Sequence, residues 1–521
     1  MNRSGLQLLS LTTLLGSLLG SSLTTLPARA NTLSVGAEDG SETVTVMLPV
    51  LNAADGVAFS ADDEVTEAVE PPFLPLMDDV MPNLDVDIEV SPTATQAIDA
   101  YNKGVKQYRE EEYALALIQF NAAIAANPDY AAAYVFRAAT QLALNNASAA
   151  MDDYLVAIAA RPDYALAYFS RGALFYEMGE VASAMDDFQQ AIALDPAYAA
   201  AHDYLGLTEA AIGNYEGALG HYATALSLEP EYAPAHMHRG AALLELEDYD
   251  AAVAALSSAI EHNEDYAEAY LNRGVAYYRL GTHPAALTDL NKSISLNAEN
   301  PEAYYNRSYV YSVLGRPNDA LSDINKVLAS QPNSIEAYMA RGSLYSAQGN
   351  TTAAIADFNR VIELDVNSSE AFRQRAIAQI DNNNVTEALS DYNSAIGLNP
   401  IDEDIYKGRA DAYAIYGNLP AAIADYTYAI ELDNSFSEAY AARGRALYES
   451  GDARSAYQDF SNIIRQNPAA SADVYYYRGL SLIAIGDSFG AHSDLQTAAE
   501  RYLADGRADG YRAVLERMRD L

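Results

Sequence analysis

The sequence contains no cysteine and no tryptophan, and it is short of basic residues. Without cysteine the chain forms no disulfide, no thiolate zinc site, no iron–sulfur cluster and no cysteine nucleophile. The 31 Lys and Arg stand against 72 Asp and Glu, which gives a net charge of −41. A surface this acidic repels phosphate backbones and anionic lipid, so we expect no nucleic-acid partner and no docking on a lipid surface.

Catalytic and nucleotide-binding motifs are missing as well. The chain has no Gly-rich phosphate loop, no His-Glu-x-x-His and no Gly-x-Ser-x-Gly. Four of the seven histidines lie near one another in the sequence: His202, His221, His236 and His238. They suggest either a metal or pH-sensing site or packing residues, and packing is favoured because His236 and His238, two apart on a helix, point away from each other. We therefore predict no enzyme, no cofactor and no metal.

The first thirty residues have the pattern of a secretory signal peptide. Arg3 supplies a basic start, residues 6–26 carry no charge, and Ala28-Arg29-Ala30 offers a small–x–small cleavage site. We expect an exported protein, periplasmic or extracellular, with no stable membrane span after cleavage. An uncleaved anchor is the alternative, because the apolar stretch is nearly long enough to cross a bilayer.

Residues 31–95 form an acidic, proline-containing spacer. They hold 14 Asp and Glu and no Lys or Arg, and such a segment repels itself and buries little, so we expect it to be disordered or extended. Residues 43–51 are a strand candidate and residues 73–77 a candidate docking motif, although a plain linker is favoured. The spacer is also a candidate for folding back on positive residues of the chain.

From Ala97 the sequence repeats every 34 residues. Eleven units run without a gap to Ala470, and a twelfth begins at Ala472 after one inserted residue. We number positions within a unit as slots 1 to 34, with Ala97 in slot 1. Slot 8 is Gly, Ala or Ser and slot 20 is Ala in all twelve units; slot 24 is always large and apolar or aromatic, and slot 4 is Tyr or Phe in nine.

This spacing predicts a pair of helices in each unit. Slots 4, 8 and 11 share one face of a first helix, and slots 20, 24 and 27 share one face of a second. Small residues at slots 8 and 20 let the helices approach, with the aromatics of slots 4 and 24 filling the space around the crossing. Gly or Asn at slot 15 in ten units suits a left-handed turn. One pair cannot bury its apolar face alone, so neighbouring pairs must stack.

The pattern resembles the tetratricopeptide repeat (TPR) family. Its positions in the third unit are Tyr168, Gly172, Phe175, Ala184, Phe188, Ala191 and Pro196. The resemblance implies an all-α fold, a right-handed α-solenoid of stacked helix–turn–helix repeats whose concave groove holds peptides or partner proteins, and it implies no chemistry. We place the TPR array of twelve repeats at 96–505, and a capping helix at 506–521 that carries an apolar stripe of Tyr511, Val514, Leu515 and Met518.

Slot 7, usually Leu in the family pattern, is Arg in ten units, and slot 23 is Asp in nine. Two exceptions occur together, since Lys103 goes with Gln119 in the first unit and Leu205 with His221 in the fourth. Only Arg239 with Ala255 is left mismatched. We therefore predict structural ion pairs within the repeats and favour them over a ligand-binding role for the arginines. Examples are Arg137 with Asp153, Arg171 with Asp187, Arg341 with Asp357, and Arg443 with Asp459.

By resemblance, slots 2, 5, 9, 12 and 13 line the groove. They are apolar in early units and polar in later ones. The candidate groove residues are Val135, Leu142, Phe169, Tyr176, Leu207, Arg373, Lys407 and Arg445. The N-terminal half would hold an apolar peptide or helix and the C-terminal half a charged segment, whereas packing between repeats is the alternative for the apolar positions.

Together these features predict an exported TPR scaffold that binds a protein or peptide partner through its groove. The competing function is a self-associating structural protein of the cell envelope. The expected capping helix argues against open-ended stacking.

Overall fold

The computed structural model of the chain describes residues 32–35, 44–47, 92–519 and 521. The expected signal peptide at 1–30 and the candidate docking motif at 73–77 lie outside the described residues. The described chain divides between Gln331 and Pro332 into two compact units, a first unit with helices α1 to α14 and a second unit with α15 to α25 and two strands.

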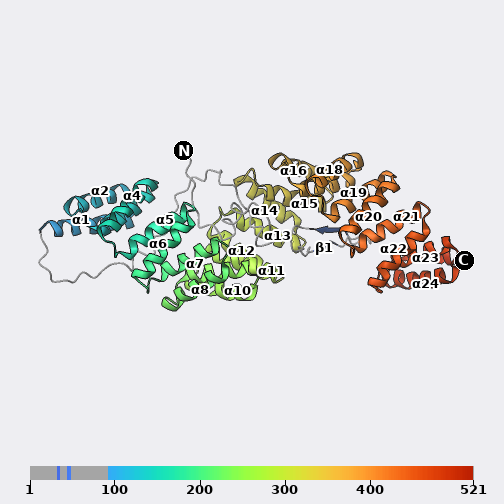
Figure 1. Ribbon diagram of the computed structural model, residues 1–521, viewed down its shortest axis with the longest axis horizontal. Coiled ribbons are helices and arrows are strands. Elements are labelled where there is room, and N and C mark those ends of the chain that lie inside the picture. The colour runs from blue at the N-terminus through green and yellow to red at the C-terminus, as the bar shows by residue number, and fades with distance from the viewer. Residues whose placement is uncertain (1–31, 36–43, 48–91, 520) are drawn as a thin grey trace. The chain divides into compact units, whose positions relative to one another are not determined.

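The first unit consists of seven helix pairs, which follow one another in chain order (Figure 1). Its helices are α1 (Pro92–Arg109), α2 (Tyr113–Ala126), α3 (Ala131–Ala143), α4 (Ala147–Ala160), α5 (Ala165–Glu177), α6 (Val181–Leu194), α7 (Ala199–Ala211), α8 (Tyr215–Leu228), α9 (Ala233–Glu245), α10 (Tyr249–His262), α11 (Ala267–Arg279), α12 (His283–Leu296), α13 (Pro301–Val313) and α14 (Pro317–Ser330). Each odd-numbered helix is the first helix of a repeat.

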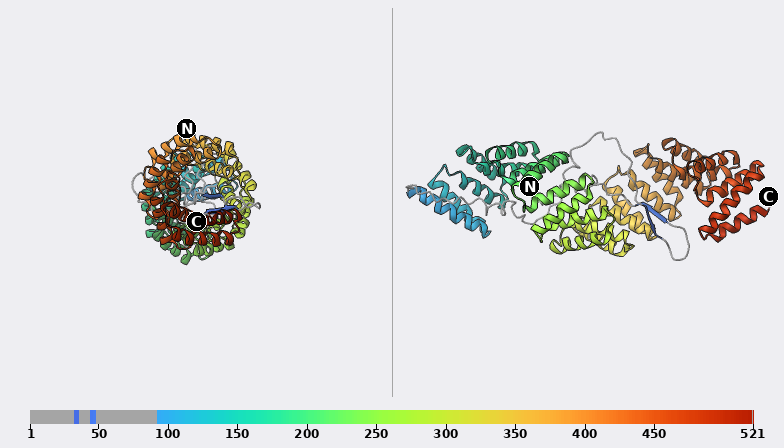
Figure 2. Two further views of the ribbon diagram at one scale, coloured as in Figure 1. Left: turned by 90° about the vertical axis from the view of Figure 1, so that its right-hand side faces the viewer. Right: turned by 90° about the horizontal axis from the view of Figure 1, so that it is seen from below.

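The second unit consists of five helix pairs and a final helix, and the views of Figure 2 show the same succession of pairs. Its helices are α15 (Ile335–Ala347), α16 (Thr351–Leu364), α17 (Ser369–Asp381), α18 (Val385–Leu398), α19 (Glu403–Tyr416), α20 (Leu419–Leu432), α21 (Ser437–Glu449), α22 (Ala453–Gln466), α23 (Ala472–Ile485), α24 (Ser488–Ala504) and α25 (Ala508–Arg519). The twelve pairs coincide with the twelve sequence units, so the described repeats form an α-solenoid. Among the described helices, none is both long enough and apolar enough to cross a bilayer.

Within each pair, a small residue on the first helix accommodates a large one on the second. A Cβ atom at Gly342 would lie 2.6 Å from Cε1 of Phe358, and one at Gly104 would lie 2.7 Å from Cε1 of Phe120. Both rings are fully buried, as are the slot-20 alanines of all twelve repeats. Slot 8 is therefore small because the slot-24 side chain lies directly against its backbone, and a methyl group there would force the ring away.

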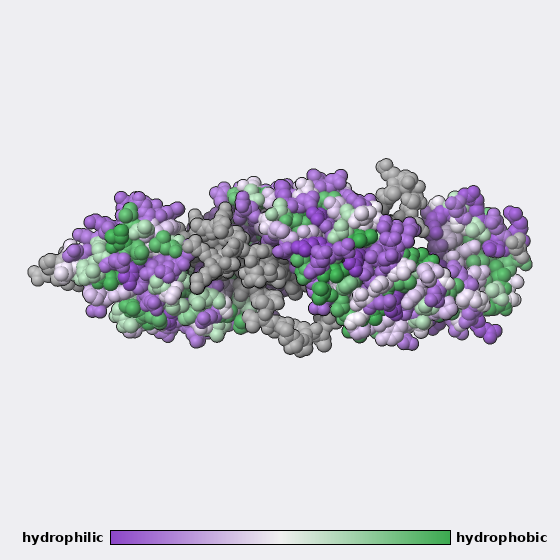
Figure 3. All heavy atoms as spheres, turned by 90° about the horizontal axis from the view of Figure 1, so that it is seen from above, coloured by the Kyte–Doolittle hydropathy of each residue, from purple (hydrophilic) through white to green (hydrophobic). Residues whose placement is uncertain are grey.

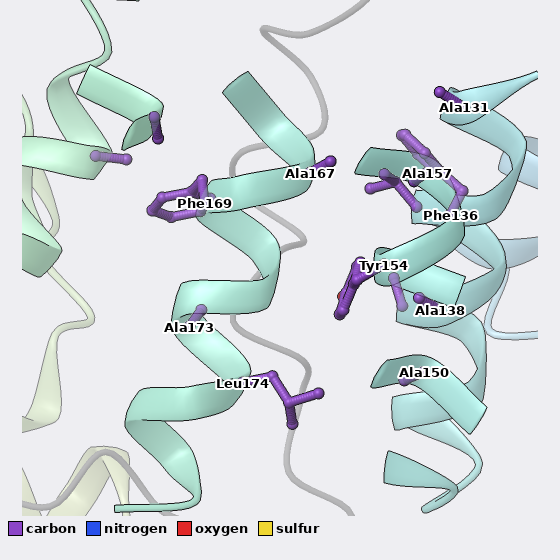
Figure 4. Close-up of a cluster of buried hydrophobic side chains, with 14 of the residues drawn as sticks. Ala131, Phe136, Ala138, Ala150, Tyr154, Ala157, Ala167, Phe169, Ala173 and Leu174 are labelled. Atoms are coloured by element: carbon purple, nitrogen blue, oxygen red, sulfur yellow. The ribbon is translucent and has the colours of Figure 1, made fainter. Parts of the chain in front are cut away.

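Helix α5 is also covered on two sides by neighbouring repeats. In Figure 4, Ala167 and Leu174 of α5 point toward the preceding repeat, which contributes Tyr154, while Phe169 points the opposite way. The Phe169 ring lies 5.2 Å, centroid to centroid, from Tyr204 of the following repeat. One core cluster therefore runs through the first four repeats, as expected for repeats that cannot bury their apolar faces alone.

The turn between the two helices is left-handed in every repeat. The slot-15 residue has a positive φ in all twelve, including the two repeats where it is neither Gly nor Asn. In those two, Glu111 and Glu247 both adopt φ 58°. A side chain with a Cβ atom is strained in this region, so these two turns store unfavourable backbone energy.

Helix α25 covers the last repeat, where a capping helix was expected. Val514 is fully buried, and Tyr511 and Met518 pack against the same cluster as Tyr502 of α24. Leu515, which the sequence placed on the same stripe, is 42% exposed instead. The stripe is therefore narrower than the sequence suggested.

Two segments of the spacer at 31–95, which we expected to be disordered or extended, form strands. Strands β1 (Thr32–Val35) and β2 (Val44–Met47) pair as an antiparallel hairpin, with Thr32 opposite Met47, so the described fold is not purely helical. Strand β2 falls inside the strand candidate at 43–51, where uncharged β-branched residues interrupt the acidic sequence. Helix α1 begins at Pro92, ahead of the expected start at 96, because proline fits the first turn of a helix.

Replacing Glu247 with glycine should stabilise the array. The Glu247→Gly variant relieves the left-handed strain and should raise the free energy of unfolding by about 1 kcal/mol, because the greater chain entropy of glycine offsets part of the gain. Urea denaturation measures the change. Gly213→Ala is the matched control: Gly213 has φ +80° with nothing within 4 Å of an added Cβ, so this change should be destabilising. A loss of stability in Glu247→Gly would contradict the assignment of strain.

Candidate functional site

The structure forms an ion pair within each of the nine repeats that carry both Arg at slot 7 and Asp at slot 23. In the eighth repeat, Arg341 Nε donates to Asp357 Oδ2 at 2.8 Å and Nη2 donates to Oδ1 at 2.7 Å. All nine pairs share this two-bond geometry. They are Arg137–Asp153, Arg171–Asp187, Arg273–Asp289, Arg307–Asp323, Arg341–Asp357, Arg375–Asp391, Arg409–Asp425, Arg443–Asp459 and Arg478–Asp494. Every one of these carboxylates is buried.

An aromatic ring covers each of these guanidinium groups. The slot-4 ring of the same repeat lies 5.2 to 5.8 Å from the arginine Cζ in all nine repeats. Besides packing at the helix crossing, as expected, the slot-4 ring thus shields the ion pair by a cation–π contact. The hydrogen bonds to Asp357 raise the pKa of Arg341, which keeps the guanidinium charged.

Six of the arginines also tie their repeat to the one before it. Arg375 Nη1 donates to Asn359 Oδ1 at 2.6 Å, and Arg409 Nη1 donates to Asn393 Oδ1 at 2.7 Å. The acceptor stands at slot 25 of the preceding repeat, and Asn121, Ser257, Asn291 and Thr427 serve in the same way. Sequence reasoning missed this bond, although Asn recurs at slot 25 in five repeats. These contacts favour a structural role for the arginines over a ligand-binding one.

A double-mutant cycle on Arg375 and Asp391 should show strong coupling. Their side chains are only 18% and 7% exposed, so removing one leaves the other buried without its partner. Changing either residue to Leu should therefore cost more stability than changing both, with a coupling energy of about 1–3 kcal/mol in urea denaturation.

The control is Arg239, which is exposed and faces Ala255 at slot 23. Arg239→Leu should change the stability by less than about 0.5 kcal/mol. Additive single and double variants at Arg375 and Asp391 would contradict the assignment of a coupled pair.

A different polar pair joins the fourth and fifth repeats, which lack the Arg–Asp pair. His238 Nδ1 donates to Asp203 and lies 2.9 Å from Oδ1 and 3.1 Å from Oδ2. Both residues are buried, and Asp203 is completely inaccessible. Sequence reasoning did not find this pair, because each residue occurs at its slot only once.

Two of the other histidines act as substitutes for tyrosine. His202 Nε2 and His236 Nε2 lie 3.2 and 2.9 Å from the carbonyl oxygens of Pro196 and Pro230. At the same slot, the Tyr338 hydroxyl donates to the carbonyl of the proline six residues earlier. The described residues contain no group of three potential ligands arranged to hold a metal ion. These contacts agree with packing rather than with a metal site.

The apolar candidate groove residues belong mainly to the core. Val135, Phe169 and Leu207 are 3%, 0% and 4% exposed, and Leu142 and Tyr176 pack partly buried against the same clusters. The apolar groove predicted from these residues is therefore corrected. In a repeat that has neighbours on both sides, the side chains of slots 5 and 9 face the first helix of the next repeat as well as the groove. In the N-terminal half, that neighbouring helix covers these side chains.

The polar candidates are different, because they remain partly accessible on the first helices of the second unit. Arg373 Nε and Nη2 each donate to Glu370 at 2.7 Å. On α19, Lys407 Nζ lies 2.8 Å from Oδ2 of Asp411, which is one turn further along the helix. The other carboxylate oxygen of Asp411 accepts a hydrogen bond from the Tyr426 hydroxyl at 2.5 Å. The carboxylates thus hold the cations in fixed positions.

The same polar character continues on α21 and α23. Arg445 is exposed and lies over the ring of Tyr477, 5.7 Å from its centroid. Asp473 accepts bonds from Tyr502 at 2.7 Å and from Arg507 at 2.7 Å. We call the set Glu370, Arg373, Lys407, Asp411, Arg445 and Asp473 the polar face.

Local electrostatics distinguish the carboxylates of the second unit. Burial raises the pKa of Asp404, although Arg373 opposes the shift. For Asp473, burial is outweighed by the hydrogen bonds from Arg507 and Tyr502, so its pKa is lowered. Burial lowers the pKa of Arg373, but Glu370, Asp404 and Asp402 together outweigh it, so the pKa is raised. The polar face therefore presents fixed charges of both signs.

Two glutamates of the first unit are buried without a strong counter-charge. Burial raises the pKa of Glu177 and of Glu245 to about 7. Each is the last residue of its helix, α5 or α9, where the helix dipole also disfavours a negative charge. Ionising them at neutral pH therefore costs stability.

Glu177→Gln should stabilise the chain at high pH only. The unfolded state ionises this group above its ordinary pKa of 4.5 and the folded state only above about 7, so wild-type stability falls as the pH rises between these values. The variant should therefore unfold at a higher temperature than wild type at pH 8, with little difference at pH 4. Glu216→Gln, at an exposed site, is the control. An equal effect at both pH values would refute the shift.

Comparisons with known proteins agree on the repeat architecture. Tetratricopeptide repeat models match residues 165–198, 204–254, 267–300, 301–334, 335–367 and 373–435, and a TPR repeat model matches 242–281. These matches fall in the third to tenth repeats. No curated protein is significantly similar in sequence.

Solved structures with similarity include yeast Tom70, which is 16% identical and aligns over 81% of this chain and 96% of its own, with a TM-score of 0.40. A tetratricopeptide repeat protein from Parabacteroides merdae is 20% identical over 47% of this chain and 97% of its own, with a TM-score of 0.38. YrrB, described as a TPR protein with an unusual peptide-binding site, is 23% identical over 34% of this chain and 92% of its own, with a TM-score of 0.31.

Proposed function

Because this chain belongs to the tetratricopeptide repeat family, we propose that it is an exported scaffold that binds a partner protein through the polar face of its second unit. The observation that carries the proposal is the set of accessible, oriented charges on α17, α19, α21 and α23. The role is one of holding a partner, and no reaction is proposed.

The charged groups of the polar face are more accessible to a partner than the slot-7 arginines are. Arg375 and Arg409 use Nε, Nη1 and Nη2 within the array, and rings cover them. Lys407 and Asp411 are each about one-third exposed, and Arg445 is exposed. Side chains that are already positioned lose little conformational entropy on binding, so they suit recognition of a charged segment.

The export part of the proposal rests on the sequence of residues 1–30, with its basic start, uncharged stretch and small–x–small site. A scaffold delivered in this way would meet its partner in the periplasm or outside the cell. Envelope self-association is the competing function. It is opposed by α25, which buries Val514 against the last repeat, and by the net charge of −41, which makes copies of the chain repel one another.

Reversing charges on the polar face should remove the partner. The full chain and a Lys407→Glu, Arg445→Glu variant are recovered from the exported fraction by an affinity tag, and captured proteins are identified by mass spectrometry. Wild type should retain a partner that the variant loses by at least about tenfold, because each reversed charge repels what it formerly attracted.

The control is Arg454→Glu, which makes the same change at an exposed site on α22, a second helix. It should retain the partner. Equal capture by all three chains would contradict binding through the polar face, and a full chain found only in the cytoplasm would contradict export.

A further inference from the structure

Six consecutive repeats of the first unit expose a large apolar residue at the same place. It is the residue that follows the first helix, at slot 14. The six residues and their exposed fractions are Leu144 40%, Met178 54%, Ile212 59%, Leu246 40%, Leu280 37% and Leu314 36%. On the face that Figure 3 draws, hydrophobic areas are interspersed with hydrophilic ones. We call this set the apolar row.

The apolar row lies outside the core described above. None of its six residues belongs to the clusters that contain Phe169, Leu207, Leu256 or Leu290. Each is the C-cap residue of its helix and precedes the left-handed turn residue. The first helices α3, α5, α7, α9, α11 and α13 contact one another in sequence. Packed helices lie roughly 8–10 Å apart, so the row is continuous.

Carboxylates surround the N-terminal part of the row. The turn segments of the first five repeats, slots 13 to 18, hold ten Asp and Glu and one basic residue, Arg109. These segments are 109–114, 143–148, 177–182, 211–216 and 245–250. All ten carboxylates except Glu177 and Glu245 are exposed, and only Glu110 has a lysine within salt-bridge distance, Lys106 at 3.6 Å.

The charge pattern decides among possible occupants. A second copy of the chain carries the same net charge of −41, and the spacer at 31–95 has 14 acidic residues and no basic one, so both are repelled. Anionic lipid is repelled for the same reason. Repeats 6 and 7 place Arg279 and Arg316 beside the row. The acidic turn segments are therefore those of Met178, Ile212 and Leu246 and the one at 109–114, which precedes the uncharged turn of Leu144.

We propose that Leu144, Met178, Ile212 and Leu246 form a second docking surface, which takes a cationic amphipathic helix of a partner protein. The apolar side of such a helix covers the row, and its Lys and Arg meet the surrounding carboxylates. The dimensions agree: three intervals of roughly 8–10 Å match the length of about 30 Å of a twenty-residue helix, which repeats an apolar position every seven residues, about 10.5 Å.

Binding of a designed peptide tests the surface directly. The probe is a fluorescent Leu/Lys peptide of about twenty residues with leucines on one helical face. Fluorescence anisotropy with the full chain should show binding, and the Met178→Ser, Ile212→Ser, Leu246→Ser variant should bind at least tenfold more weakly. Glu247→Gln with Asp250→Asn, which leaves the row intact, should also weaken binding. Circular dichroism checks that each variant keeps its helix content.

Matched controls separate the apolar and charged contributions. Val366 and Ile401 are 65% and 72% exposed in the second unit, and their Ser variants should bind as wild type does. A Ser/Lys peptide of equal charge and a Leu/Glu peptide of equal apolarity should both bind weakly. The proposal is overturned if either control peptide binds as well as the Leu/Lys peptide, if wild type binds none, or if the row variant binds unchanged. It is equally overturned if sedimentation shows self-association that the row variant abolishes.

These results are independent of the polar face, because Lys407 and Arg445 are unchanged in every variant. Loss of partner capture through the polar face leaves the peptide experiment intact, and the reverse also holds. The two surfaces can therefore fail separately.

Discussion

The repeats depend on the guanidinium group of the slot-7 arginine, which binds several neighbouring groups at once. In six repeats, the slot-7 arginine donates two bonds to an aspartate of its own second helix and a third to slot 25 of the preceding repeat, beneath an aromatic ring, as Arg375 does. Such a half-buried pair adds little net stability over apolar side chains of the same shape. The pair instead fixes the register of the helices. A shift of one residue in either helix would separate the charges and leave a carboxylate buried alone. Only one alignment of the two helices and of successive repeats is therefore tolerated.

The sequence predicted the features that recur and missed those that occur once. The recurrence of slots 8, 20 and 24 in twelve units predicted the helix pairs. The joint absence of Arg and Asp in the fourth repeat indicated, from the sequence alone, that these two residues form an ion pair. Asp203 and His238 pair across two repeats in a way no other repeat copies, so no pattern pointed to them. The groove was misjudged for a related reason. Slot 5 of Phe169 and slot 5 of Arg373 are equivalent in sequence, yet only the first is sealed by large aromatic neighbours such as Tyr198 and Tyr204.

The two units use their first helices for different purposes. In the first unit, large apolar residues at slots 5 and 9 are part of the core between repeats, so little of these helices is accessible to a ligand. Exposed apolar side chains lie instead at the turns, as Met178 and Ile212 do. In the second unit the same slots carry Arg373, Lys407 and Arg445, which are too polar to be sealed. A change of residue type at a single slot thus moves the accessible surface from one edge of a repeat to another without altering the fold.

The excess of acid gives both surfaces their selectivity. On the polar face Arg373 and Lys407 are already held by carboxylates, so an incoming charged segment must offer a complementary arrangement rather than charge alone. Along the apolar row most of the carboxylates are exposed. This surface would otherwise attract any exposed hydrophobic chain, and the carboxylates make it repel acidic chains, copies of this protein included. A scaffold with exposed hydrophobic residues stays dispersed only if its charge repels most other chains. A net charge of −41 repels acidic chains and attracts cationic partners.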